Sequence, residues 1–194
     1  MERGGLLMEA IGHLDRPGSK ASLIAADLRG WGETAPEFAP FENVSWGGPD
    51  RFAAYIGASL GDAWLLRRAL PTNTRTVLHA IGAAGPVALH LAALARSFSA
   101  VILHDAPGSY EDLLNTEAMN WPHDIILPGV LQHYDLPILA ETAGCPVYWL
   151  NPRDGAGQPL SREECARRTH DNLHWHFDAK PADHLAMLRE LLYA

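Results

Sequence analysis

Ten histidines are scattered along this sequence, and two of them, His174 and His176, stand close enough together to suggest a site. An imidazole changes its protonation near neutral pH, so a histidine can act as a general base or as a metal ligand. If "NLHWHF" (172–177) is a strand, both rings point to one face, because side chains two positions apart share a face. No known ligand spacing links them to further ligands, so we expect neither a metal nor a cofactor.

A second stretch, "LHAIGAAGPVALHLAAL" (78–94), indicates a strand, a tight turn and a helix. Gly82 stands at the apex of the turn. The backbone N–H groups around Ala83 and Ala84 begin the helix, and such groups can bind an oxyanion. Gly82 itself has no side chain and cannot serve as a nucleophile.

Other reactive residue types have structural explanations. Cys145 and Cys165 are too few for a disulfide framework or a zinc site, so we expect buried thiols. Ser109 and Ser161 are each followed three residues later by an acidic residue, which is typical of helix N-caps. His90 stands between leucines of a helical stretch and is expected to be a core residue.

The elements that position these residues follow from runs of apolar residues. Strands are predicted at 23–26, 74–81, 99–105, 145–151 and, as a short fifth strand, 172–177. Helices are predicted at 6–14, 49–70, 85–96 and 181–193. Strands that alternate with helices favour an α/β fold, a mostly parallel sheet with helices on both faces. In such sheets ligands bind beyond the carboxyl ends of the strands, where Asp105 ends the third strand.

The remaining long connection, about 109–140, has room for two helices and predicts a helical cap over a pocket. The whole chain, 1–194, is expected to be a single domain, because one core suits this length.

Composition limits the classes of partner. The formal net charge is −8 and no run of lysine or arginine occurs, which argues against nucleic acid and against anionic membranes. No apolar run approaches the roughly 20 residues of a membrane span, and the first residues lack the pattern of a secretory leader. We therefore expect a cytoplasmic protein whose partner is a small molecule.

Four segments in order resemble the α/β-hydrolase superfamily: "DLRGWGET" (27–34), "AIGAAG" (80–85), "CPVYWLNPRDGAGQPL" (145–160) and "HWHFDAKPADHLAMLRELL" (174–192). Within it, the block around "YDLP" and "NPRDGAGQPL" is most similar to bacterial acetyl-xylan-esterase-like hydrolases. The resemblance implies an α/β-hydrolase-like sandwich, the strand–turn–helix of a nucleophile elbow at "AIGAAG", and an ester or lactone as substrate.

The resemblance also assigns residues. The nucleophilic serine falls on Gly82, the acid of the triad on Asp154 and the histidine on His174, with His176 and His184 as alternatives. Trp31, in the loop "DLRGWGET", and Asp105 are expected to line the pocket.

Two departures from the family pattern limit the chemistry. The serine is absent, and the family's first strands, with one oxyanion donor, have no counterpart before the first predicted helix. His174 held by Asp154 could still activate a water, which predicts slow hydrolysis of an ester or lactone. The missing strands would expose a sheet edge, so we expect a homodimer or another cover.

Two further hypotheses remain open. The protein could be a hydrolase-like binding or scaffold protein that has lost its chemistry. Alternatively, residues 77–105 could be a dinucleotide-binding unit in which Gly82 and Gly85 are fingerprint glycines and Asp105 binds the ribose.

Overall fold

The structure, a computed structural model, describes residues 21–26, 49–71 and 73–193, with side chains except those of residues 49–55 and 181. The chain divides into two compact units, residues 27–178 and a smaller unit that joins residues 1–26 to 179–194. The predicted helix at 6–14 and the loop "DLRGWGET" with Trp31 lie outside the described residues.

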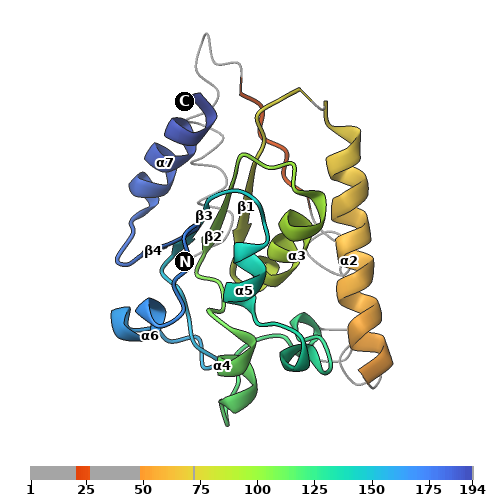
Figure 1. The fold of residues 1–194 in the computed structure, drawn as a ribbon, viewed down its shortest axis with the longest axis vertical. Coiled ribbons are helices and arrows are strands. Elements are labelled where there is room, and N and C mark those ends of the chain that lie inside the picture. Colours follow the sequence, from red (N-terminus) through yellow and green to blue (C-terminus); the bar gives the residue numbers. More distant parts are fainter. Residues whose placement is uncertain (1–20, 27–48, 72, 194) are drawn as a thin grey trace. The chain divides into compact units, whose positions relative to one another are not determined.

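A four-stranded parallel sheet forms the centre of the larger unit (Figure 1). Its strands are β1 (Val77–Ile81), β2 (Ala100–His104), β3 (Val147–Leu150) and β4 (Leu173–His176), and they lie side by side in chain order. These are four of the five predicted strands, and the α/β class is confirmed.

The remaining prediction, a strand at 23–26, is wrong. Residues 21–26 form neither strand nor helix, and Leu23 and Ile24 are 40% and 51% exposed. An apolar run becomes a strand only when a neighbouring strand supplies the ladder hydrogen bonds, and residues 21–26 have no such ladder.

One face of the sheet is covered by helix α3 (Gly85–Ala95), which packs against β1 and β2, and by α5 (Leu136–Glu141), which packs against α3 and β4. Alternate strand residues point into this layer, because side chains in a strand alternate between faces. Val101, Leu103, Val147 and Trp149 are completely buried there. Helix α2 (Pro49–Ala69) packs on α3.

The connection between β2 and β3 contains α4 (Tyr110–Asn115), the 3₁₀ turns η4 (His123–Ile125) and η5 (Val130–Gln132), and α5. The Ser109 hydroxyl accepts a hydrogen bond from the Asp112 N–H at 2.9 Å, so the predicted N-cap is confirmed. Apolar side chains of this segment join the core, among them Leu113, Ile125, Val130 and Leu136. That the segment caps a ligand pocket stays a prediction.

Helix α6 (Arg162–Ala166) follows the loop after β3. Ser161 and Glu164 form a capping box at its start, as the sequence predicts. Both cysteines are buried free thiols, which is also as predicted.

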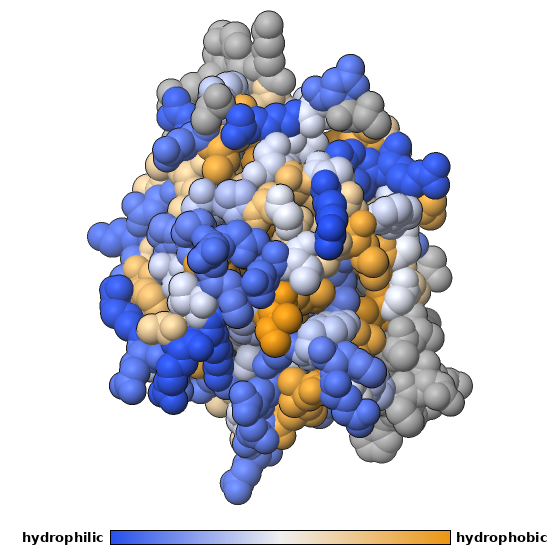
Figure 2. Space-filling view, in the orientation of Figure 1, coloured by the Kyte–Doolittle hydropathy of each residue, from blue (hydrophilic) through white to orange (hydrophobic). Residues whose placement is uncertain are grey.

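In the smaller unit, α7 (Pro181–Tyr193) has Pro181 at its start and buries Leu185 and Leu188. None of the described helices is long and apolar enough to cross a membrane. On the face drawn in Figure 2, hydrophilic residues are widespread and apolar residues form separate patches between them.

Candidate functional site

The carboxyl ends of the strands share one backbone feature. Gly82, Asp105 and Asn151 directly follow β1, β2 and β3 with φ of 59°, 49° and 51°, and Asp178 follows β4 after one residue with φ of 58°. This left-handed region favours glycine and admits Asn and Asp more readily than other residues. Residues with such backbone conformations are concentrated at active sites and ligand-binding sites. The edge where α/β proteins bind ligands is therefore also where this backbone turns sharply.

The turn between β1 and α3 has the predicted strand–turn–helix form. Gly82 is buried and begins the 3₁₀ turn η3 (Gly82–Ala84), and the Gly85 N–H donates to the Gly82 carbonyl. A Cβ on Gly85 would lie 2.6 Å from the Cβ of Ala106, so this glycine lets the start of α3 approach the segment after β2. Because Gly82 offers no nucleophile, the turn can contribute only backbone groups such as the Ala83 N–H.

Asp105 is the centre of a charged cluster at the end of β2. Its Oδ1 accepts hydrogen bonds from Arg153 Nε at 2.8 Å and from Arg153 Nη2 at 2.6 Å, while its Oδ2 lies 3.2 Å from His104 Nε2. Burial lowers the pKa of His104, the negative charge of Asp105 raises it and the Arg153 charge lowers it. Both carboxylate oxygens of Asp105 are thus engaged within the protein.

Arg153 is fixed through its backbone as well. Its N–H donates to the Ala106 carbonyl at 3.0 Å, and its own carbonyl accepts from the Gly108 N–H at 2.8 Å. Isolated β-bridges link Arg153 to Pro107 and to Pro159. The loops after β2 and β3 therefore form one connected structure that holds the guanidinium in place.

Asp154 stabilises its own loop. Its Oδ1 accepts hydrogen bonds from the N–H groups of Ala156 at 2.9 Å and Gln158 at 2.7 Å. The indole of Trp121 donates to the Asp154 carbonyl at 2.7 Å. These contacts are typical of an Asx turn, and they give Asp154 a structural role whatever else it does.

His174 does not lie at the carboxyl edge. It pairs in register with Tyr148, two residues before β3 ends, and its exposed ring stacks on that tyrosine at 5.1 Å between centroids and 25° between planes. No hydrogen bond joins His174 to Asp154 among the contacts of these two described residues.

His176 stands nearer the edge than His174. It pairs with Leu150 and ends β4, and its pKa is lowered by burial and by the charge of His174. The other alternative, His184, is buried on α7 and belongs to the smaller unit.

The pocket at this edge has a volume of about 380 Å³ and lies beyond β3 and β4. Its lining includes Arg153, Leu160, Arg162, Phe177 and Asp178. A second pocket of about 420 Å³ lies before the same strands, at their amino ends, and includes Cys145 and Asn172. Since ligands of parallel sheets bind at the carboxyl ends, the first pocket is the candidate site.

Sequence reasoning placed Asp105 at this edge but missed Arg153 and Arg162. Arg153 could have been found from its position in "NPRDG", directly after a strand and beside the assigned acid. No sequence pattern pointed to Arg162, because it stands in a mostly charged stretch that is typical of a solvent-exposed helix.

Within the described residues, no group of three or more histidine, cysteine or acidic side chains could hold a metal ion. No protein-family model matches the sequence, and no curated protein matches it.

Proposed function

We propose that this protein binds a small molecule at the carboxyl edge of its sheet and that it does not turn this molecule over through an acyl-enzyme. The proposal starts from the sequence motifs that resemble those of α/β-hydrolases. The turn at Gly82 joins β1 to α3 with a positive φ at its apex and offers no nucleophile, and a pocket lies beyond β3 and β4.

The observation that carries this proposal is that the two residues of the expected catalytic pair each have other contacts. Asp154 directs Oδ1 to the N–H groups of its own loop, and His174 is stacked on Tyr148 in the body of the sheet. A general base needs an imidazole that is oriented by a partner and within reach of the substrate. Among the described residues His174 has no hydrogen-bond partner that would orient it, so binding without turnover is the function that these contacts favour.

The proposal is tested with a panel of short acyl esters and lactones, on which wild type and His174→Ala are compared. We expect both proteins to hydrolyse the panel at the same background rate. Thermal shifts should show binding of at least one compound, because a ligand that binds only the folded state raises its stability. A loss of about a hundredfold or more in rate on removing His174 would contradict the proposal.

A second candidate is slow hydrolysis by an activated water. One observation favours it: both side-chain hydrogen bonds described for Asp154 are accepted by Oδ1, and none by Oδ2. This oxygen remains open to an imidazole. The variants His176→Ala and Asp154→Asn, assayed on the same panel, extend the test to this candidate, which predicts parallel losses of rate in both.

Dinucleotide binding has less support. The close approach of Gly85 to Ala106 suits the third glycine of a fingerprint. However, Asp105 already accepts two hydrogen bonds from Arg153 and lies beside His104, which leaves it less available to a ribose hydroxyl. A thermal-shift assay with NAD and with FAD is expected to show no stabilisation.

A further inference from the structure

We propose that the pocket beyond β3 and β4 takes a small organic carboxylate with a compact apolar body, held between Arg153 and Arg162. The inference rests on the proposed binding function and names the ligand class for that same site.

The pocket has an apolar surface for the body of such a ligand and charged residues for its carboxylate. Leu160 and Pro152 are buried residues of the lining, and the half-buried ring of Phe177 adds an aromatic surface. Ligand pockets are typically apolar with a few polar groups that fix orientation. Here the lining includes two arginines, a residue type whose guanidinium group matches the planar geometry of a carboxylate.

Arg153 is organised before any ligand arrives. Asp105 holds its Nε and Nη2, whereas Nη1 donates no hydrogen bond in the described contacts. Its side chain is 28% exposed, so part of it is accessible to solvent. Such a fixed donor binds a ligand without a further loss of side-chain freedom.

Arg162 is the adaptable partner. Its guanidinium lies over the Phe177 ring at 4.6 Å from the centroid and makes a loose ion pair with Asp178, in which Nη2 and Oδ2 are 3.7 Å apart. The side chains of Arg162 and Asp178 are 73% and 94% exposed. An ion pair of this length and exposure contributes little, so a ligand carboxylate can take the place of Asp178.

The net charge of −8 does not oppose this assignment. Charges more than about 8 Å away are largely screened at physiological ionic strength, so the nearest groups decide which ligand is accepted. Two arginines stand in the lining with Asp178 as its acidic residue. Displacement of Asp178 leaves Arg162 to the ligand, while Arg153 remains paired with Asp105.

The first experiment compares benzoate with benzamide, which has the same ring and shape but no charge, by ligand-detected NMR titration. We expect benzoate to bind with a dissociation constant on the order of millimolar, and more weakly at high salt. Benzamide should bind at least about tenfold more weakly, because it forms no charge-assisted hydrogen bonds.

Two variants, one at the start of α6 and one just after its end, locate the site. Arg162→Gln should weaken benzoate binding by about tenfold or more. Arg167→Gln is the matched control, because Arg167 is also exposed on this helix region but pairs with Glu163 and does not line the pocket. This control should bind benzoate as wild type does.

A third variant acts in the opposite direction. Asp178→Asn removes the competing carboxylate and should tighten benzoate binding by about twofold to tenfold, since asparagine accepts the left-handed φ of this position.

Equal binding of benzoate and benzamide, or equal binding by Arg162→Gln and wild type, would overturn the carboxylate assignment and leave the binding function in place. If neither compound binds wild type, the assignment is also overturned. The binding function is then judged separately, by the panel of neutral esters and lactones.

Discussion

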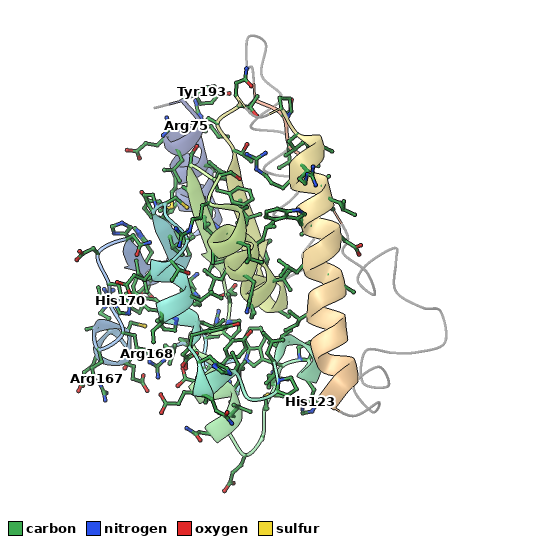
Figure 3. The ribbon with its side chains drawn as sticks, turned by 45° about the vertical axis from the view of Figure 1, so that its right-hand side comes forward. Arg75, His123, Arg167, Arg168, His170 and Tyr193 are labelled. Carbon is green, nitrogen blue, oxygen red and sulfur yellow. The ribbon has the colours of Figure 1, made fainter. Side chains whose placement is uncertain are left out.

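Asp124 has an environment that its sequence neighbours do not suggest. The side chain is 2% exposed, and neither of its carboxylate oxygens has a hydrogen-bond partner among the described residues. It belongs to η4, which contacts α2, and Figure 3 shows its neighbour His123 beside one end of that helix. Burial raises the pKa of Asp124 to about 6, because a charged form is poorly solvated in the interior.

This raised pKa makes a prediction about stability. Asp124 binds its proton more tightly in the folded state than in the unfolded chain, so its favourable contribution is complete below about pH 4 and is lost as the pH rises to about 6. Asp124→Asn cannot ionise and should be more stable than wild type at about pH 7, by roughly 1–3 kcal/mol. At about pH 4 this advantage should disappear.

Urea unfolding of both proteins between about pH 4 and pH 7 measures the effect. The exposed Glu117→Gln is the control, and its stability should follow that of wild type across this range. Parallel curves for Asp124→Asn and wild type would show that the buried carboxylate is not the source of the pH dependence.

At the scale of the residue, the sequence was informative where a side chain acts on its own backbone. Ser109 and Ser161 were predicted as N-caps because their partners stand three residues away in the chain. The partner of Asp105 was not predictable in this way. Arg153 is 48 residues distant and reaches Asp105 because β2 and β3 are neighbours in the sheet.

At the scale of the element, two glycines in helices have opposite environments. Gly85 begins α3, and a Cβ there would lie 2.6 Å from the Cβ of Ala106, an atom fixed close to the backbone. Gly57 lies within α2, is exposed, and has open space where a Cβ would stand. Both residues are helical glycines in the sequence, and their surroundings alone distinguish them.

Alanine at each position should therefore change the stability in opposite directions. Gly85→Ala should destabilise by about 1–3 kcal/mol, because α3 must move away from the segment after β2. Gly57→Ala should stabilise by about 0.5–1 kcal/mol, because alanine favours the helix and makes no clash. Chemical denaturation of both variants measures the difference. Stabilisation by Gly85→Ala would mean that α3 does not pack this closely.

The strands illustrate which elements sequence patterns can locate. The runs that became β1 to β4 are apolar, and each lies next to at least one other strand. Residues 23–26 have a similar composition but remain exposed and irregular. Strand propensity depends on neighbours, so composition could not separate these two cases.

At the scale of the whole molecule, the sheet ends at β1 and β4 in the described part of the chain. A strand at the end of a sheet has unpaired N–H and C=O groups along one side, which other chains can use. We expect the protein to form a homodimer that covers such an edge, as the sequence predicts.

Sedimentation velocity over a wide range of protein concentration tests this expectation. The dimer fraction should rise with concentration, and the transition should respond little to salt, because backbone hydrogen bonds rather than surface charges hold the pair. A protein that stays monomeric at the highest concentration contradicts it.

The sequence by itself determined the elements whose cause is local. Apolar runs with turn residues between them located four strands, helices α2, α3 and α7, the N-caps and the turn at Gly82, since propensity, periodicity and capping act within a few residues. It also determined that the apex of that turn has no nucleophile.

Only the tertiary structure decided how the side chains of distant elements combine. It directed Asp154 to its own loop, placed His174 against Tyr148, and joined Arg153 to Asp105 beside a pocket that also contains Arg162. These contacts depend on strand order and register, which bring together residues that are far apart in the chain. A pattern along the sequence contains no information on that pairing, and for this reason the expected His174–Asp154 pair and the two arginines could be judged only in the folded protein.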